Sequence, residues 1–150
     1  MQNEESIKPR PLVAGRRIIY FLIAVVVILI TRHSVLDWHR VTGNSMQPTL
    51  QPGNWRWCNK LAYGFRAPFG IGYLTRWAEP QPGEIVILTL PTNGQHCIKR
   101  VATPPADQIP PGLGYVWVLG DNGEHSLDSR QVGFVSDKLI EGRVAGNEER

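Results

Sequence analysis

Hydrophobic residues fall into two arrangements along the chain. Residues 18–30 are apolar without interruption, with Arg16 and Arg17 before the run and Arg32 after it. From residue 53 onward, apolar residues come in short runs separated by turns rich in glycine and proline. A helix that is apolar on all sides needs apolar surroundings, whereas short runs between turns are typical of strands. The pattern therefore predicts one helical segment followed by a mainly β domain.

The apolar run is short for a membrane span, but no polar face interrupts it as in a surface helix of a small domain. A helix of 13 residues is about 20 Å long, whereas the hydrocarbon core of a bilayer measures about 30 Å. Flanking arginines that reach the two interfaces would extend the helix over residues 16–36 and make it long enough. The alternatives are a buried core helix and a cleaved signal peptide, for which the residues after the run lack a small-residue cleavage site. We expect a transmembrane anchor at residues 16–36.

Basic residues are distributed unevenly around this run. Four lie before it and two lie closely after it. The positive-inside rule then places residues 1–15 in the cytoplasm as a short tail. Residues 37–150 would form a domain on the outer face of the inner (cytoplasmic) membrane, so the lipid bilayer is an expected partner.

The domain is expected to be a compact antiparallel β fold. Strand patterns occur at residues 53–60, 84–90, 95–102, 115–119, 133–135 and 138–144. The Asn93-Gly94 pair signals a hairpin that makes the second and third of these antiparallel. Residues 61–77 carry five aromatic residues with neither a strand period nor a helix period, so we expect no ordinary strand or helix there. They would form either an aromatic loop on the core or a patch at the lipid interface.

Composition excludes several classes of function. The net charge is +3 and no run of five or more basic residues occurs, so nucleic acid is not an expected partner. Cys58 and Cys97 match no zinc-site or redox spacing, and they are either two separate thiols or one disulfide. We expect no metal and no cofactor.

Ser45 is the candidate nucleophile. It lies in a segment where Gly43 permits a tight turn and Pro48 prevents a helix or a central strand. A hydroxyl held on a bent loop is accessible to a substrate, but it needs a neighbouring base. The four histidines show no triad spacing, although chain order alone does not exclude one.

Lys99 is the candidate base. On the predicted strand it shares a face with Cys97 and Val101, which would bury it. Burial disfavours the charged form and could lower the lysine pKa from about 10.4 towards neutrality. By pattern alone, a solvated edge lysine remains the alternative.

Several motifs in order carry a resemblance to one family. They are Gly43–Leu50, Asn59–Gly64, Pro82–Val86, Ile98–Val101, and Gly120–Asn122 with Ser126–Arg130. Together, behind an amino-terminal apolar segment, they resemble bacterial type I signal peptidases (leader peptidases). The likeness covers about residues 16–144.

The resemblance implies a membrane-bound serine endopeptidase that cleaves signal peptides from secreted preproteins with a Ser/Lys dyad. Ser45 matches the nucleophile, and its backbone N–H is the expected oxyanion donor. Lys99 matches the general base, and Ser126 matches the hydroxyl that orients its amine. Asp128 and Arg130 match a supporting ion pair. The implied partners are preprotein signal peptides, the lipid bilayer and the secretion machinery.

The chain departs from the family pattern at three places. Gly43 stands where many members carry a serine that supplies a second oxyanion donor, residues 103–114 are short, and Gly123–His125 replace an Arg-Asp-Asn sequence. These departures leave substrate range open. The alternatives are a dedicated peptidase for pilins or conjugation proteins, a mitochondrial inner-membrane counterpart, and a non-catalytic anchored β domain that binds peptides in a secretion assembly.

Overall fold

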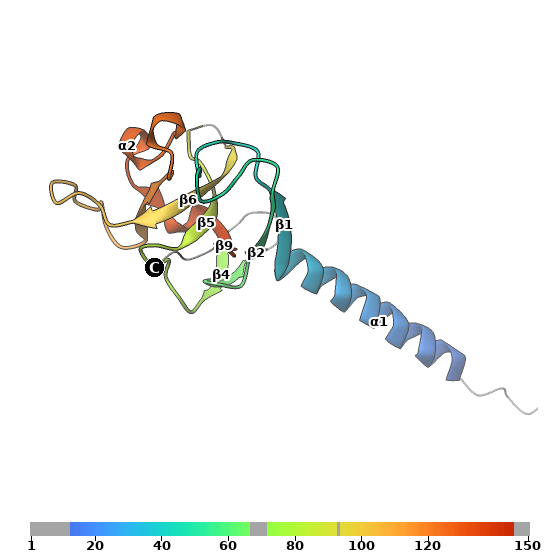
Figure 1. Cartoon of the computed structure of the whole chain (residues 1–150). Coiled ribbons are helices and arrows are strands. Elements are labelled where there is room, and N and C mark those ends of the chain that lie inside the picture. The colour runs from blue at the N-terminus through green and yellow to red at the C-terminus, as the bar shows by residue number, and fades with distance from the viewer. Residues whose placement is uncertain (1–12, 67–71, 93, 146–150) are drawn as a thin grey trace, which may run out of the picture.

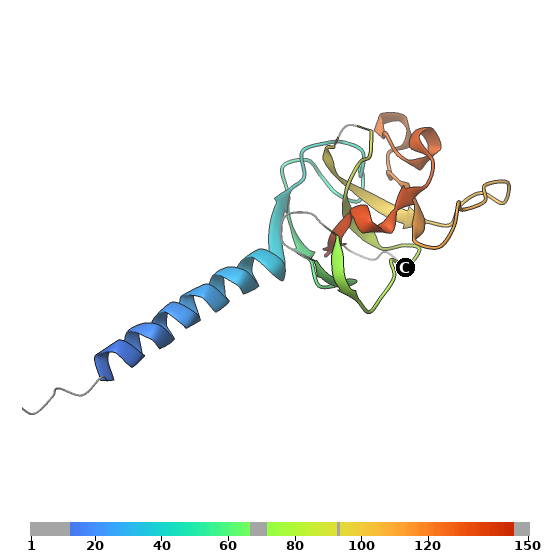
Figure 2. The ribbon, with the colours of Figure 1, turned by 180° about the vertical axis from the view of Figure 1, so that it is seen from behind.

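The computed structural model describes residues 13–66, 72–92 and 94–145. Helix α1 (Val13–Ser34) projects away from the β domain that follows it (Figures 1 and 2). Large apolar side chains of this helix are exposed, with Phe21 at 68%. The alternative of a buried core helix is therefore wrong.

The structure has a helix where the membrane anchor is predicted, but the membrane span itself is not supported. Within the described part of the chain, no helix is both long enough and apolar enough to cross a bilayer. The structure thus gives no support to a transmembrane segment over residues 16–36, and Leu36 begins a strand. Most of the expected tail, residues 1–12, and the chain end, residues 146–150, lie outside the described residues.

The domain after α1 is mainly β, and every strand pair in it is antiparallel. The strands are β1 (Leu36–Arg40), β2 (Trp55–Asn59), β3 (Gly64–Arg66), β4 (Tyr73–Arg76), β5 (Ile85–Thr89), β6 (His96–Ala102), β7 (Tyr115–Leu119), β8 (Val135–Ser136) and β9 (Ile140–Val144). A seven-stranded sheet has the order β1-β2-β9-β5-β6-β7-β8, and β3 and β4 form a separate pair. Short helices are η2 (Gly123–His125), α2 (Ser129–Val132) and η3 (Asp137–Leu139). The predicted antiparallel β domain is confirmed.

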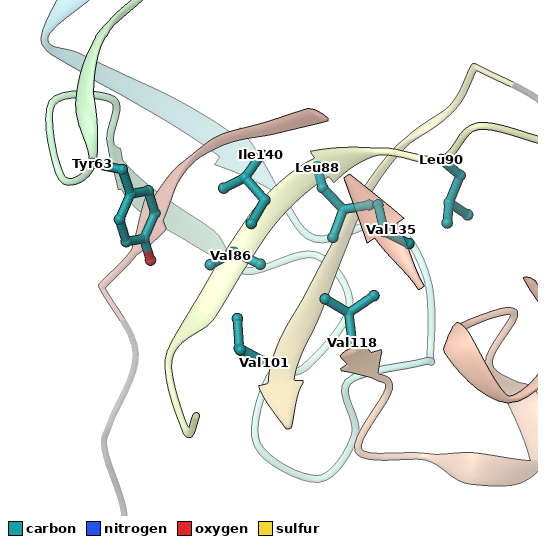
Figure 3. Packing of buried hydrophobic residues seen from close by; sticks show 8 residues of the cluster. All are labelled: Tyr63, Val86, Leu88, Leu90, Val101, Val118, Val135 and Ile140. Carbon is teal, nitrogen blue, oxygen red and sulfur yellow. The ribbon is translucent and has the colours of Figure 1, made fainter. Parts of the chain in front are cut away.

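Two apolar clusters hold the sheet together, and β5 contributes to both because alternate side chains of a strand point to opposite faces. The first cluster, drawn in Figure 3, contains Tyr63, Val86, Leu88, Leu90, Val101, Val118, Val135 and Ile140. The second contains Val41, Met46, Leu50, Cys58, Ile85, Ile87 and Val144. Fully burying one such aliphatic side chain stabilises the fold by about 1.5–3 kcal/mol. Strand β5 therefore anchors the centre of the sheet through side chains on both of its faces.

The hairpin prediction is confirmed for its strands, since β5 and β6 pair from Ile85 with Arg100 to Thr89 with His96. Residue 93 of the turn lies outside the described residues. The sequence prediction misses β1, because the anchor was expected to extend to residue 36 and the first strand pattern was placed at residues 53–60. The alternation of apolar and polar residues in Leu36–Arg40 could have revealed this strand, which pairs with β2 along its whole length.

The prediction of no ordinary strand in residues 61–77 is wrong, because β3 and β4 form a hairpin there. Gly64 permits this close approach, since a Cβ at that position would lie 2.2 Å from the Thr75 carbonyl oxygen. Tyr63 and Tyr73 pack on the first cluster, whereas Leu74 and Trp77 are exposed. Part of this segment, residues 67–71, lies outside the described residues, and contact with lipid stays a prediction.

Candidate active site

Ser45 lies on the loop between β1 and β2 and is half-buried. Two side chains that follow it, Met46 and Leu50, are buried in the second apolar cluster, and the Leu50 N–H donates to the Met46 carbonyl at 2.8 Å. The Ser45 carbonyl accepts a hydrogen bond of 2.9 Å from the Asn122 N–H, in the loop after β7. The loop is thus fixed on both sides of the serine.

Lys99 lies in the middle of β6, opposite Val86 of β5, and its side chain is buried with 3% exposure. Its Nζ donates a hydrogen bond of 2.9 Å to Oγ of Ser126. Burial lowers the pKa of Lys99 below its ordinary value. Burial also raises the pKa of the neighbouring Cys97 thiol to about 11, so no negative charge forms there near neutral pH. Both cysteines are free thiols.

Asp128 is fully buried, and its ion pair is with Arg130 and not with Lys99. Its carboxylate accepts hydrogen bonds from Ser126 Oγ at 2.6 Å, from the Gly120 N–H at 2.8 Å and from Arg130 Nε at 2.9 Å. Burial alone would raise the pKa of Asp128, but the bonds from Arg130, Gly120 and Ser126 outweigh it and hold that pKa well below its usual range. The ion pair of Asp128 is with Arg130. The hydrogen-bond partner of the Lys99 amine is therefore the Ser126 hydroxyl and not a carboxylate.

The backbone around these groups passes from an extended segment into a short helix. Ser126 and Asp128 are extended, but Asp128 is the N-cap of α2, and its side chain accepts from the Arg130 N–H. Gln131 completes the capping box by accepting from the Asp128 N–H at 3.0 Å. The ion pair arises because Arg130 sits in the first turn of the helix that Asp128 caps.

Gly120 lies against both the Ser45 loop and Ser126. A Cβ on this residue would lie 2.1 Å from Oγ of Ser126 and 2.6 Å from the carbonyl oxygen of Ser45. No side chain other than hydrogen fits in that space. The Ser45 loop and the Lys99–Ser126 pair therefore pack against the same glycine.

A cleft of about 290 Å³ opens beside Ser45. One wall comes from the end of β1 and the residues after it, and the other comes from the start of β6, including Ile98. β1 is an edge strand paired with β2 alone, and β6 pairs with β7 only from Arg100 onward. Both walls therefore carry a strand edge without a ladder partner within the described residues. Such edges can bind an extended peptide.

Comparison with known proteins identifies the family. A family model described as "Signal peptidase, peptidase S26" matches residues 15–112 and 110–146. The chain belongs to this signal peptidase family. The resemblance read from the sequence motifs is thereby confirmed.

Two groups of family members are similar to the chain. It is 32% identical over 138 residues to mitochondrial inner membrane protease subunit 1 of Schizosaccharomyces pombe. It is 30% identical over 135 residues to mitochondrial inner membrane protease subunit 2 of Saccharomyces cerevisiae. A signal peptidase I of Buchnera aphidicola is 29% identical over 90 residues.

These matches differ in how much of each protein they cover. The match spans 81% of this chain and 82% of the Schizosaccharomyces pombe subunit. For the Saccharomyces cerevisiae subunit the shares are 79% and 71%. The Buchnera match spans 59% of this chain but 29% of that signal peptidase I. The chain thus corresponds to less than a third of that relative's length.

Sequence reasoning missed two groups of residues around the signal peptidase site. Arg100 donates to Asp121 at 2.8 and 2.9 Å, which ties β6 to the loop after β7. Both residues lie in the motifs that carry the family resemblance, so the motifs could have indicated this ion pair. His39 and His96 both line the cleft. Only the fold brings β1 and β6 to one cleft.

Proposed function

We propose that the protein is a serine endopeptidase that cleaves N-terminal signal peptides from preproteins with a Ser45/Lys99 dyad. The observation that carries this proposal is the environment of Lys99. Its amine is buried and donates to the Ser126 hydroxyl, while the nearby Asp128 carboxylate is paired with Arg130. A buried amine without a carboxylate partner favours the neutral form, which a general base requires.

The first step transfers a proton from Ser45 to Lys99. A neutral amine has two N–H groups and one lone pair; one N–H donates to Ser126 Oγ, which leaves the lone pair for the serine proton. As the Ser45 oxygen attacks the substrate carbonyl, Lys99 becomes an ammonium and Ser45 forms an ester with the substrate. The ammonium then returns the proton to the leaving amine, and a water activated by Lys99 hydrolyses the ester.

The negative oxygen that develops in these steps needs hydrogen-bond donors. Within the described residues no acceptor takes the Ser45 N–H, whereas the Ser45 carbonyl is held by Asn122. We assign the Ser45 N–H as one oxyanion donor. Gly43 has no side-chain donor, so a second donor would come from the backbone or from the substrate.

We further propose that α1 anchors the protein in a membrane, with its N-terminus in the cytoplasm and the β domain on the outer face. Support comes from the exposed apolar side chains of the helix and from the basic residues before it. Two relatives are named as proteases of the mitochondrial inner membrane. Contact with the secretion machinery would follow from this location.

A second candidate is a protease of the type represented by those mitochondrial relatives. The matches span 71% and 82% of the two mitochondrial subunits but only 29% of the Buchnera signal peptidase I. This difference in coverage favours the mitochondrial type over a general signal peptidase. The chemistry would be the same in both cases. The difference would lie in the substrates, including the dedicated case of a pilin or conjugation protein.

The test is preprotein cleavage by the detergent-solubilised full chain. Wild type should process the substrate, whereas Ser45→Ala, Lys99→Ala and Lys99→Arg should not, because an arginine cannot supply a neutral base. Lys138→Ala removes an exposed lysine outside the site and should leave processing intact. Cleavage by Ser45→Ala, or by Lys99→Arg, would refute the dyad. Binding of preprotein without cleavage by wild type would favour the non-catalytic alternative.

A further inference from the structure

The cleft beside Ser45 is not uniformly apolar. Apolar side chains in its lining include Val41, Met46, Ile87 and Ile98. The last residues of β1 and the first residue of β6 add three polar side chains, His39, Arg40 and His96, which we call the polar end of the cleft. One arginine and two imidazoles thus share a small volume with the proposed nucleophile.

The charges at this end are not balanced within the lining. No aspartate or glutamate is among the described residues that line the cleft. Within the described part of the chain, Arg40 makes no ion pair. The lining therefore carries one fixed positive charge and no carboxylate of its own.

One of the two histidines is held by a carboxylate outside the lining. Nδ1 of His96 lies 2.6 Å from Oε1 of Glu141, which also accepts from the Thr89 hydroxyl at 2.7 Å. Nε2 of His39 lies 3.5 Å from Oδ2 of Asp37, but it is buried and makes no hydrogen bond within the described residues. With Nδ1 of His96 directed at Glu141, its Nε2 stays available to a ligand and donates a hydrogen bond when the ring is protonated.

We propose that the His39/Arg40/His96 end of the cleft binds an acidic side chain of the substrate, a few residues from the bond that is cut. The proposal rests on the proposed function, because it assigns a specificity to the same cleft. An extended peptide along the open edges of β1 and β6 would carry its side chains alternately into the cleft. A carboxylate at one such position would accept hydrogen bonds from the guanidinium and from a protonated imidazole.

The test uses pairs of fluorescent peptides with an Ala-Xaa-Ala core that differ by one Asn→Asp exchange at successive positions along the peptide. Their affinities are measured with full-length Ser45→Ala protein in detergent, so that binding is observed whether or not cleavage occurs. At one position the Asp peptide should bind about fivefold more tightly than the Asn peptide. The ratio should fall towards one at high salt, because the cleft is open to solvent.

Variants identify the residues responsible. In the Ser45→Ala background, Arg40→Gln should bring the Asp/Asn affinity ratio close to one, and His96→Gln should lower it partially. Arg40→Glu should reverse the preference, so that a peptide with Lys at the same position binds more tightly than the Asn peptide. A gained preference cannot result from misfolding. Lys138→Gln removes an exposed positive charge outside the cleft and should leave the ratio unchanged.

Two results would overturn the inference: a ratio near one at every position, or an acidic preference that survives in Arg40→Gln. Cleavage of the same peptides by the protein with Ser45 intact is measured separately. An acidic preference in binding with no cleavage would refute the proposed function and leave this inference standing. Cleavage without any acidic preference would support the proposed function and refute this inference.

Discussion

The Nζ atom of Lys99 lies 2.9 Å from Oγ of Ser126, and both side chains are buried. The same hydroxyl donates to Asp128 at 2.6 Å, which directs its lone pairs towards the amine. Ser126 therefore positions the lysine nitrogen by a hydrogen bond and not by an ion pair. The negative charge of Asp128 is balanced by Arg130.

Ser126→Ala tests this positioning. Without the hydroxyl, the Lys99 amine loses its hydrogen-bond partner and its fixed place, and kcat should fall about 100-fold with little change in KM. Ser129→Ala is a matched control, because it removes another buried hydroxyl, one that accepts from the Val118 N–H. It should lower the free energy of unfolding by about 1 kcal/mol and leave kcat nearly unchanged. Equal kcat losses in the two variants would argue for a merely structural role of Ser126.

Gly120→Ala tests the close packing between the serine loop and the Lys99–Ser126 pair. The new Cβ would lie 2.1 Å from Ser126 Oγ, so both partners must shift. We expect a loss of stability of about 1–3 kcal/mol and a larger loss of activity than that destabilisation explains. Gly15→Ala in α1 meets nothing within 4 Å and should be neutral in both assays. Full activity of Gly120→Ala would show that the packing is not needed for catalysis.

Asp128→Asn tests the buried carboxylate. It removes the ion pair and weakens the bonds from the Gly120 N–H and Ser126, so urea unfolding at pH 7 should show a loss of about 3 kcal/mol. The pKa of Asp128 is lowered in the folded state, so its contribution is present above the unfolded pKa of about 3.9 and is lost as pH falls through the folded pKa. The difference between wild type and variant should shrink below about pH 4. Asp107→Asn, at an exposed position, should change little at any pH.

Lys99→Met tests the cost of burying the amine. The folded-state pKa of Lys99 is lowered, so the unfolded chain binds more protons than the folded one at pH values between the folded pKa and about 10.4. Wild-type stability should therefore rise with pH in that window. The variant should be inactive, more stable than wild type at pH 7, and should show this advantage decreasing as pH approaches 10. A variant less stable than wild type at pH 7 would mean that Lys99 is stabilising as a cation.

Local pattern was sufficient for part of the fold and site. The turn residues and β-branched runs predicted β5, β6 and β7, and the order of the motifs gave the family. The motifs also single out Ser45 and Lys99, whose catalytic roles stay a prediction. The burial of Lys99 followed from its strand neighbours Cys97 and Val101.

The rest depended on contacts between distant segments. Pairing with β2 defines β1, and the capping box of α2 brings Arg130 back to Asp128 instead of along an extended strand. The polar end of the cleft arises because the fold brings His39 and His96, from distant segments, to the lining of one cleft. Periodicity within one segment carries no information about which segments meet.

The central claim is that Lys99 is uncharged when the enzyme works. NMR titration of lysine side chains in the labelled full chain measures this directly, with Lys99→Arg identifying the signal among the four lysines. We expect the Lys99 signal to titrate at lower pH than the other lysines, at the same midpoint as kcat/KM. A Lys99 signal that titrates with the other lysines near pH 10.4, in an enzyme already fully active at pH 8, would contradict the account.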